Sequence, residues 1–221
     1  MLTLGLDTAT DVCAVALLDD DRVLFEASLD VPRSHGRRLA PLVAEAFAHV
    51  GRSTDDLDLV AVSAGPGSYT GLRIGTSTAK GLALATDALV VAVPTLLALA
   101  APADAEGPVA AVLPSRRGEI YAAVYDGEAE IAAPAALALD DVAGWLLSGT
   151  VALGGPGADR LAEVRPDLPR LALRPSGAAV ARLGRRRVEA HGPDDVAALE
   201  PLYLKPVAAS QPRGILDTPT L

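Results

Sequence analysis

The sequence predicts an α/β protein of two lobes that repeat one order of strands and helices. In the first hundred residues, three extended segments separated by polar turns precede alternating helical and extended segments. The second half repeats this order more loosely, after a cluster of proline, glycine and acidic residues at 102–108. A chain of 221 residues is long enough for one large domain or two small ones. We therefore expect lobes at residues 1–104 and 105–221, each with a mixed sheet in the order β-β-β-α-β-α-β-α.

Hydrophobic periods locate the elements within each lobe. In the first lobe, residues 34–50 place apolar side chains at a helical spacing, and residues 57–62 form an apolar run typical of a buried strand. The other elements expected there are strands at 2–6, 12–18, 22–30 and 89–93 and a helix from Thr95. In the second lobe we expect strands at 109–113, 119–125, 151–153 and 171–173 and helices at 140–147 and 177–190.

Residues 63–81 are the most informative part of the chain. The Gly-Pro-Gly triplet at 65–67 predicts a turn, because glycine accepts positive φ and proline fixes its own. Ser68 and Thr70 can accept hydrogen bonds from the first N–H groups of the helix that follows. Glycine inside a helix costs about 1 kcal/mol relative to alanine, so we expect a phosphate or another helix, from this lobe or a second chain, against the bare face. That face carries Gly71, Gly75, Ala79 and Ala83.

Three known motifs do not fit this segment. The P-loop requires serine or threonine after its lysine, whereas Gly81 follows Lys80. The glycines of the dinucleotide fingerprint would be one residue too far apart at their last step. A nucleophile elbow needs its serine on a strand-to-helix turn, whereas Ser77 falls in mid-helix.

Composition excludes several classes of protein. Half of the chain is hydrophobic but only 3% is aromatic, so the core is built mainly from alanine, valine and leucine. A formal charge of −9 argues against a free-standing nucleic-acid binder. Cys13 is the only cysteine, which rules out a disulfide framework and a thiolate zinc site. The start lacks a secretory signal, and the longest uncharged run, 88–103, is interrupted by prolines and too short to span a bilayer. We expect a cytoplasmic protein with no membrane contact.

Five segments of the chain resemble the TsaB family, and the two-lobed layout resembles the actin-like, ribonuclease-H-like ATPase fold. The 65–75 segment, Gly-Pro-Gly-Ser-Tyr-Thr-Gly-Leu-Arg-Ile-Gly, is the most specific of the five. The resemblance covers about the first 125 residues closely and the rest mainly in layout. Where family members carry an acidic and a small residue, this chain has Pro114 and Ser115. The other four segments are Asp-Thr-Ala-Thr at 7–10, Arg-Ser-His at 33–35 leading into 39–41, 116–121 and 201–205.

The resemblance implies a non-catalytic dimerisation subunit. TsaB proteins are similar to the metal-bearing transferase TsaD, pair with it through their first lobe and are filed among glycoprotease-like proteins. With the small ATPase TsaE, the pair transfers a threonylcarbamoyl group from threonylcarbamoyl-AMP to N6 of the adenosine beside the tRNA anticodon. We therefore expect TsaD-type and TsaE-type partners, a homodimer when the chain is alone, and tRNA contact only through the complex. No cofactor is expected in this chain, although ATP or ADP could bind at the partner interface, and the metal belongs to the partner.

The expected partner surface lies on the helices at 34–50 and 71–85. On this view, Gly75→Leu should abolish pairing and leave the monomer folded. The interface residues expected are His35, Leu39, Leu42, Gly71, Leu72, Gly75, Ala79 and Leu82.

A second expected feature is a vestigial nucleotide loop, because the glycine turn at 154–157 lacks a neighbouring acidic or hydroxyl residue that would complete a phosphate site. The residues of this loop are Asp7, Thr8, Ala9, Thr10, Gly65, Gly67 and Ser68.

The spacing of the histidines argues against a metal site and against a catalytic centre. His35 and His49 lie at opposite ends of one expected helix, about 21 Å apart at 1.5 Å rise per residue, so they cannot share an ion. His191 follows the last helix. On that helix, four arginines form either a tRNA backbone contact within the complex or a solvated face. They are Arg182, Arg185, Arg186 and Arg187.

Two other functions stay open. An independent actin-like ATPase or kinase would bind ATP at Asp7 and a second phosphate loop. A glycoprotease-like peptidase ranks last, because the chain offers neither metal ligands nor a nucleophile constellation at a recognisable spacing.

Overall fold

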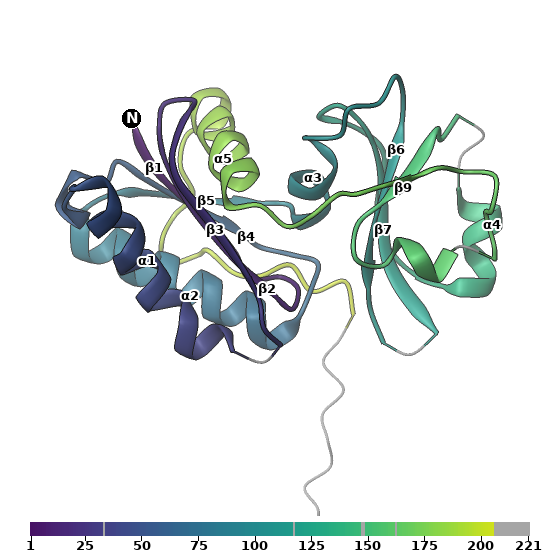
Figure 1. The fold of residues 1–221 in the computed structure, drawn as a ribbon, viewed down its shortest axis with the longest axis horizontal. Helices are drawn as coiled ribbons and strands as arrows, with labels where there is room; N and C mark the ends of the chain where they lie inside the picture. The colour runs from purple at the N-terminus through teal and green to yellow at the C-terminus, as the bar shows by residue number, and fades with distance from the viewer. Residues whose placement is uncertain (33, 117, 147–148, 162, 206–221) are drawn as a thin grey trace, which may run out of the picture.

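The computed structural model describes residues 1–32, 34–116, 118–146, 149–161 and 163–205. Two five-stranded sheets lie side by side, one in each half of the molecule, with a short helix and the chain's last helix between them (Figure 1). This arrangement confirms the expected α/β protein with two mixed sheets. Arg33, Arg117 and the part of the second expected lobe beyond Lys205 lie outside the described residues.

The first sheet has the strand order β3-β2-β1-β4-β5. Its first three strands pair antiparallel, and β4 and β5 join parallel to β1. The central strands are buried on both faces, which explains their continuous apolar runs. The strands are β1 (Leu2–Asp7), β2 (Val12–Asp19), β3 (Arg22–Asp30), β4 (Leu59–Ser63) and β5 (Leu89–Val93).

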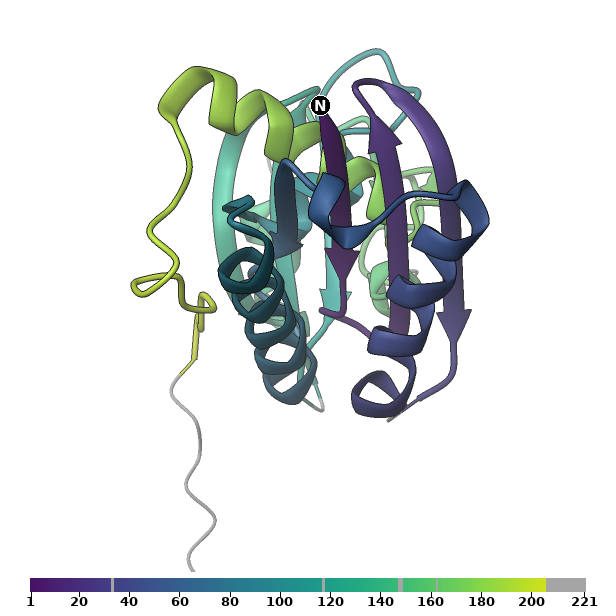
Figure 2. The same cartoon turned by 90° about the vertical axis from the view of Figure 1, so that its left-hand side faces the viewer.

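Helices cover both faces of this sheet. On one face lie α1 (His35–Val50) and α2 (Tyr69–Thr86), which begin and end within two residues of the predicted positions. On the other face lies α5 (Gly177–His191), the yellow-green helix that crosses the upper part of Figure 2. The helix α1 ends at Gly51, whose φ of 64° belongs to the left-handed region that glycine favours.

The second sheet repeats the topology of the first, in the order β8-β7-β6-β9-β10. Its helices are short: α3 (Thr95–Ala100) packs on the face toward the first lobe, while α4 (Val142–Trp145) and single 3₁₀ turns cover the other face. In place of the longer helix expected at 140–147, the structure has one 3₁₀ turn followed by one turn of α-helix. The strands are β6 (Val109–Pro114), β7 (Glu119–Asp126), β8 (Ala129–Ala138), β9 (Ala152–Gly154) and β10 (Arg170–Leu171), and the 3₁₀ turns of this lobe are Leu139–Asp141 and Ala158–Leu161. A further 3₁₀ turn, Thr54–Asp56, precedes β4 in the first lobe.

The helix α5 belongs to the first lobe in space although it follows the second in sequence. It approaches the first sheet at backbone contact: a Cβ added to Gly5 would lie 2.0 Å from the carbonyl oxygen of Gly177. A Cβ on Gly184 would lie 2.3 Å from the Cβ of Ala61. The half of the chain from residue 105 therefore gives its longest helix to the first lobe, because glycines on both sides permit this close packing.

Among the described residues, none of the helices combines the length and the apolarity that crossing a bilayer demands.

Candidate functional site

The turn between β4 and α2 forms where the sequence predicts it. Gly65 has a φ of 119°, and the Gly65–Pro66 peptide bond is cis. The N–H of Gly65 donates to Oγ1 of Thr95 at 3.0 Å, which ties the turn to the start of α3. Ser68 caps α2, since its hydroxyl accepts from the N–H of Gly71 at 3.2 Å. The turn thus directs α2 back across the sheet.

The bare face of α2 packs against its own lobe. A Cβ on Gly71 would lie 2.0 Å from the carbonyl oxygen of Thr8, and one on Gly75 would lie 2.3 Å from Oγ1 of the same residue. That hydroxyl donates to the carbonyl of Gly71 at 2.8 Å, and Ala79 and Ala83 continue the contact into the core. The neighbour that requires the glycines is the loop between β1 and β2. A leucine at position 75 would collide with Thr8, which argues against the expectation that Gly75→Leu would leave the monomer folded.

The structure places most of the expected partner-interface residues in the core of the first lobe. His35 is 6% exposed, and its Nε2 lies 3.2 Å from the carbonyl oxygen of Val12 in the same lobe. The hydrophobic period marks the face that a helix buries in its own core, and this face cannot also meet a partner. The expected interface residues that are buried are His35, Leu39, Leu42, Gly71, Leu72, Gly75 and Ala79, while Leu82 is half-buried.

The outward face of α1 and α2 is instead lined by other small residues. On α1, Gly36, Ala40 and Ala44 are exposed at a spacing of four residues, and on α2 Ser77 and Gly81 are exposed. No atom outside its own helix backbone and chain neighbours lies within 4 Å of a Cβ built on Gly81. Small residues therefore run along the outside of both helices, beside the exposed side chains of Arg37, Arg38, Glu45 and Leu84.

The expected nucleotide loop is closed by protein. Asp7 and Thr8 are buried, and a Cβ on Gly67 would lie 2.4 Å from the carbonyl oxygen of Ala9. The N–H of Ser68 donates to that carbonyl at 2.7 Å, so a hydrogen bond joins the 7–10 loop to the turn at 65–68. Burial raises the pKa of Asp7 to about 6, against the hydrogen bond that its Oδ1 accepts from the N–H of Ala9. Of the loop residues, Ala9, Thr10 and Gly65 are also buried, Gly67 is half-buried and Ser68 is exposed.

Two cavities open between the lobes. The larger, about 710 Å³, lies beside Thr10 and Asp11 and reaches the second glycine turn at Gly155. That turn packs on its own lobe, since a Cβ on Gly155 would lie 2.5 Å from the carbonyl oxygen of Val112.

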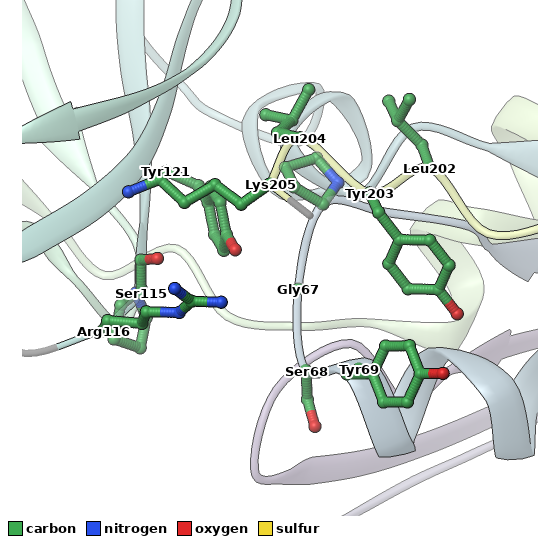
Figure 3. A pocket seen from close by; sticks show the side chains of 12 residues that line it. Gly67, Ser68, Tyr69, Ser115, Arg116, Tyr121, Leu202, Tyr203, Leu204 and Lys205 are labelled. Carbon is green, nitrogen blue, oxygen red and sulfur yellow. The ribbon is translucent and has the colours of Figure 1, made fainter. Parts of the chain in front are cut away.

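The smaller cavity, about 400 Å³, brings together three of the segments singled out in the sequence (Figure 3). It is lined by the turn at 66–69, by the chain's described end at 202–205, and by residues 114–116 and Tyr121, which include both ends of the 116–121 segment. The rings of Tyr69 and Tyr203 lie against each other with centroids 5.1 Å apart. Lys205 bridges the gap to the second lobe through an ion pair with Glu119 at 2.5 Å.

A C-terminal strap, residues 194–205, delivers Tyr203 and Lys205 to this cavity. The N–H of Leu202 donates to the carbonyl oxygen of Ala64 at 2.6 Å, and the Nζ of Lys80 donates to two strap carbonyls. A Cβ on Gly65 would lie 2.4 Å from the carbonyl oxygen of Leu202. Sequence reasoning assigned no site role to this strap. The signal available was the tyrosine in each of the three segments, in a chain with only four.

The histidines lie in separate environments. The ring of His49 packs against that of Phe25 with centroids 5.6 Å apart, at the other end of α1 from His35. Within the described ranges, no group of three or more histidine, cysteine, aspartate or glutamate side chains is placed to hold a metal ion.

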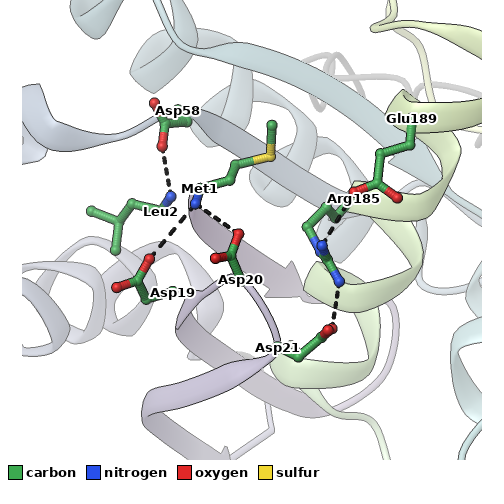
Figure 4. A network of polar contacts seen from close by, with 8 residues as sticks. All are labelled: Met1, Leu2, Asp19, Asp20, Asp21, Asp58, Arg185 and Glu189. Atoms are coloured by element: carbon green, nitrogen blue, oxygen red, sulfur yellow. Dashed lines mark hydrogen bonds and ion pairs between the residues drawn. The ribbon is translucent and has the colours of Figure 1, made fainter.

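Part of the arginine cluster on α5 is held in ion pairs. Arg185 contacts Asp21 at 2.5 Å and Glu189 at 3.2 Å, near the amino terminus, which is itself paired with Asp20 at 2.9 Å (Figure 4). Arg186 contacts Glu128 at 2.6 Å, in the turn between β7 and β8. These contacts favour the interpretation of a solvated helix face that also ties α5 to both lobes.

Comparison with known proteins agrees with the resemblance. The family model for TsaD, described as tRNA N6-adenosine threonylcarbamoyltransferase, matches residues 29–198. The tRNA threonylcarbamoyladenosine biosynthesis protein TsaB of Escherichia coli (strain K12) is 39% identical over 128 residues, 57% of this chain and 55% of that protein. TsaB of Bacillus subtilis (strain 168) is 35% identical over 126 residues, 57% and 55% of the two chains. The chain thus spans about half the length of the curated relatives it matches.

Two solved structures extend the likeness to most of the chain. YeaZ from Pseudomonas aeruginosa superposes with a TM-score of 0.80 at 28% identity, covering 92% of this chain and 99% of that one. A second structure, described as an uncharacterized protein with similarity to peptidase YEAZ from the same organism, gives a TM-score of 0.81 at 29% identity with the same coverage. The two repeated sheets have the expected two-lobed actin-like fold. This chain therefore belongs to the family of TsaD, and within it to TsaB.

Proposed function

We propose that this chain is a non-catalytic subunit of the machinery that adds a threonylcarbamoyl group to tRNA. Its role is to pair, through the first lobe, with a metal-bearing transferase of its own family. The observation that carries the proposal is the closure of the 7–10 loop onto the turn at 65–71. Gly67 and Gly71 leave no room for a phosphate there, because the carbonyl oxygens of Ala9 and Thr8 occupy that space.

The named relatives support the same role. Two curated proteins that match 57% of the chain carry the name of a biosynthesis protein in this pathway. Further proposals follow from the resemblance: a TsaE-type ATPase as the third component, a homodimer in the absence of the transferase, and contact with tRNA only in the complex. The chain would act in the cytoplasm, with ATP or ADP at the partner interface and the metal in the partner.

The pairing surface that we propose is the outward face of α1 and α2. Small side chains at Gly36, Ala40 and Ala44 would let a partner helix approach closely, and Ser77 and Gly81 continue this surface on α2. A matching pair of helices on the partner would bury the face of both chains. This surface differs from the inward face that the stripe of glycine and alanine on α2 first suggested.

Two glycines provide a matched test of this surface. Gly81 on α2 and Gly144 on α4 both have open space where a side chain would be added. The full chain is titrated with the TsaD-type subunit of the same organism by calorimetry. Gly81→Trp should weaken binding at least about tenfold, because an indole would hold the helices apart, whereas Gly144→Trp should bind normally. Equal affinity for the two variants, with both folded by circular dichroism, would contradict the proposed surface.

The ATPase alternative is tested by turnover. An independent ATPase or kinase would hydrolyse or transfer phosphate from Mg-ATP without a partner, and Asp7→Ala would abolish this. We expect no turnover by the purified chain, since Asp7 is 2% exposed and its loop is closed.

A further inference from the structure

We propose that the smaller interlobe cavity binds a nucleotide, that is, a planar ring carrying a phosphate. This site goes beyond the proposed pairing role, which needs no ligand in this chain. Its lining includes residues of the 65–69 turn but none of the closed 7–10 loop, and its walls come from both lobes and the C-terminal strap. A volume of about 400 Å³ is in the range of small-molecule pockets.

Aromatic side chains gather at this cavity in a chain that has few of them. The sequence holds four tyrosines, two phenylalanines and one tryptophan, and three of the tyrosines line this one cavity. Tyr69 and Tyr203 are 40% and 39% exposed, whereas Tyr125, the fourth tyrosine, is 3% exposed in the core. Exposed tyrosines at a cavity offer flat apolar faces on which a planar ring can stack. Tyr121 also packs against the core of the second lobe, whereas Tyr69 and Tyr203 lie outside the core clusters, so the placement of these two rings points to a ligand.

The same cavity carries the groups that bind phosphate. The guanidinium of Arg116 extends into it toward Gly67, opposite the rings of Tyr69 and Tyr203 (Figure 3). Guanidinium matches phosphate geometry with two parallel N–H donors. Beside it, the hydroxyl oxygen of Ser115 is shielded from solvent and has no hydrogen-bond partner within the described part of the chain. Because its guanidinium extends into the cavity, Arg116 is the residue that we assign to the phosphate, and Lys205 is held in its ion pair with Glu119 at the same wall.

The larger cavity lacks this combination. Its lining includes the carboxylates of Asp11, Asp30 and Asp159 together with Arg170 and Arg174, and it contains no aromatic side chain. Three carboxylates would repel a phosphate, and no flat ring is available for stacking. Nucleotide chemistry is therefore assigned to the smaller cavity alone.

The nucleotide could reach this site as a free molecule or as one unstacked residue of an RNA strand. Both present a planar base and a phosphate to the same groups. The test therefore uses three probes with the purified full chain and no partner: AMP, adenosine and a short single-stranded RNA. Binding is measured by calorimetry for the first two and by fluorescence anisotropy for the RNA. Because no partner is present, failure of this proposal leaves the pairing proposal intact, and the reverse is also true.

We expect AMP to bind saturably and adenosine to bind at least about tenfold more weakly. Arg116→Gln should weaken AMP about tenfold and leave adenosine unchanged, and Tyr203→Ala should weaken both. Tyr203→Phe, which keeps the ring, should bind AMP normally. Arg174→Gln, in the larger cavity, serves as the matched control and should have no effect. Tighter binding of the RNA than of AMP, with the same loss in Arg116→Gln, would identify a strand as the natural source.

Four results would overturn the proposal. One is the absence of saturable binding of both AMP and RNA at millimolar concentration. Another is a loss of AMP binding in Arg174→Gln but not in Arg116→Gln, which would place the site in the larger cavity. The third is equal affinity for AMP and adenosine, which would leave Arg116 without a phosphate to bind. The fourth is loss of AMP binding by Tyr203→Phe, which would contradict ring stacking. Thermal unfolding of each variant shows whether it is folded. If Tyr203→Ala does not fold, the result for Tyr203→Phe still decides the test.

Discussion

The two lobes share one strand order but differ in how their sheets are covered. In the first, helices of 16, 18 and 15 residues cover both faces. In the second, the faces are covered by helices of 6 and 4 residues and by single 3₁₀ turns. The sheet topology is therefore retained where the helices are reduced. The strands therefore define the fold of each lobe, while the length of the helices determines how much surface the lobe has for contact with a partner protein.

This contrast divides the roles of the lobes. The first lobe has spare helical surface on the outside of α1 and α2, where we place the partner. The second lobe contributes a thin wall, with Ser115, Arg116 and Tyr121 at the smaller cavity. The strap and α5 return from the second half to the first, so the two lobes cannot be exchanged or removed as independent units.

The largest expected effect comes from removing a core leucine in the well-covered lobe. Leu4 is fully buried between long helices, whereas Leu161 is equally buried but lies in a 3₁₀ turn. We expect Leu4→Ala to cost about 4 kcal/mol and Leu161→Ala about 2.5 kcal/mol, because a short turn can collapse into the cavity more easily than a long helix. Chemical denaturation measures both changes. Equal losses would mean that the second core is as rigid as the first.

The contact between α5 and the first sheet can be broken at Gly177. A Cβ there would lie 2.5 Å from the backbone nitrogen of Ala16. Gly177→Val should therefore cost about 3 kcal/mol by overpacking. Hydrogen exchange should show lost protection in β1 and β2, and unchanged protection in β6 and β7. If β6 and β7 lost protection first, α5 would support the second lobe instead. Gly144→Val, in open space, is the control.

The buried carboxyl group of Asp7, in the closed loop of the first lobe, should make the protein's stability depend on pH. Its pKa is about 6 in the folded protein and 3.8 in the unfolded chain, so the folded state retains the proton over this interval. Stability should therefore fall as pH rises from 4 to 6, by roughly 2 to 3 kcal/mol, and stay low at neutral pH. Asp7→Asn keeps the oxygen that accepts from Ala9 and should remove this fall. The free energy of unfolding of the variant and of the wild type is measured at pH 4 and pH 7. If it changed by the same amount in both proteins, the pH dependence assigned to Asp7 would be contradicted.

Sequence reasoning recovered the first lobe well, because its strands are buried runs and its helices are long enough to show their period. It also identified the five family segments, three of which meet at the smaller cavity. The error lay in the bare face of α2: a run of glycine and alanine shows that something lies close but not what. Here it is Thr8, 63 residues earlier in the chain than Gly71. The position of α5 could not be foreseen either, since a period of apolar residues does not say which sheet they cover.

The smallest effect tests whether the outward face of α2 is kept smooth for a partner. Gly81 is exposed within the helix, and a Cβ there would contact nothing within 4 Å. In the isolated chain, Gly81→Ala should raise the free energy of unfolding by about 0.5–1 kcal/mol, because alanine loses less backbone entropy in a helix. A glycine that costs stability and supports nothing in its own lobe is best explained by a requirement outside it. Gly81→Ala should therefore stabilise the free chain in thermal unfolding while weakening its affinity for the transferase. A variant that gained stability and kept full affinity would show that the first lobe's helical surface has room to spare at this position, and the partner contact would then centre on α1.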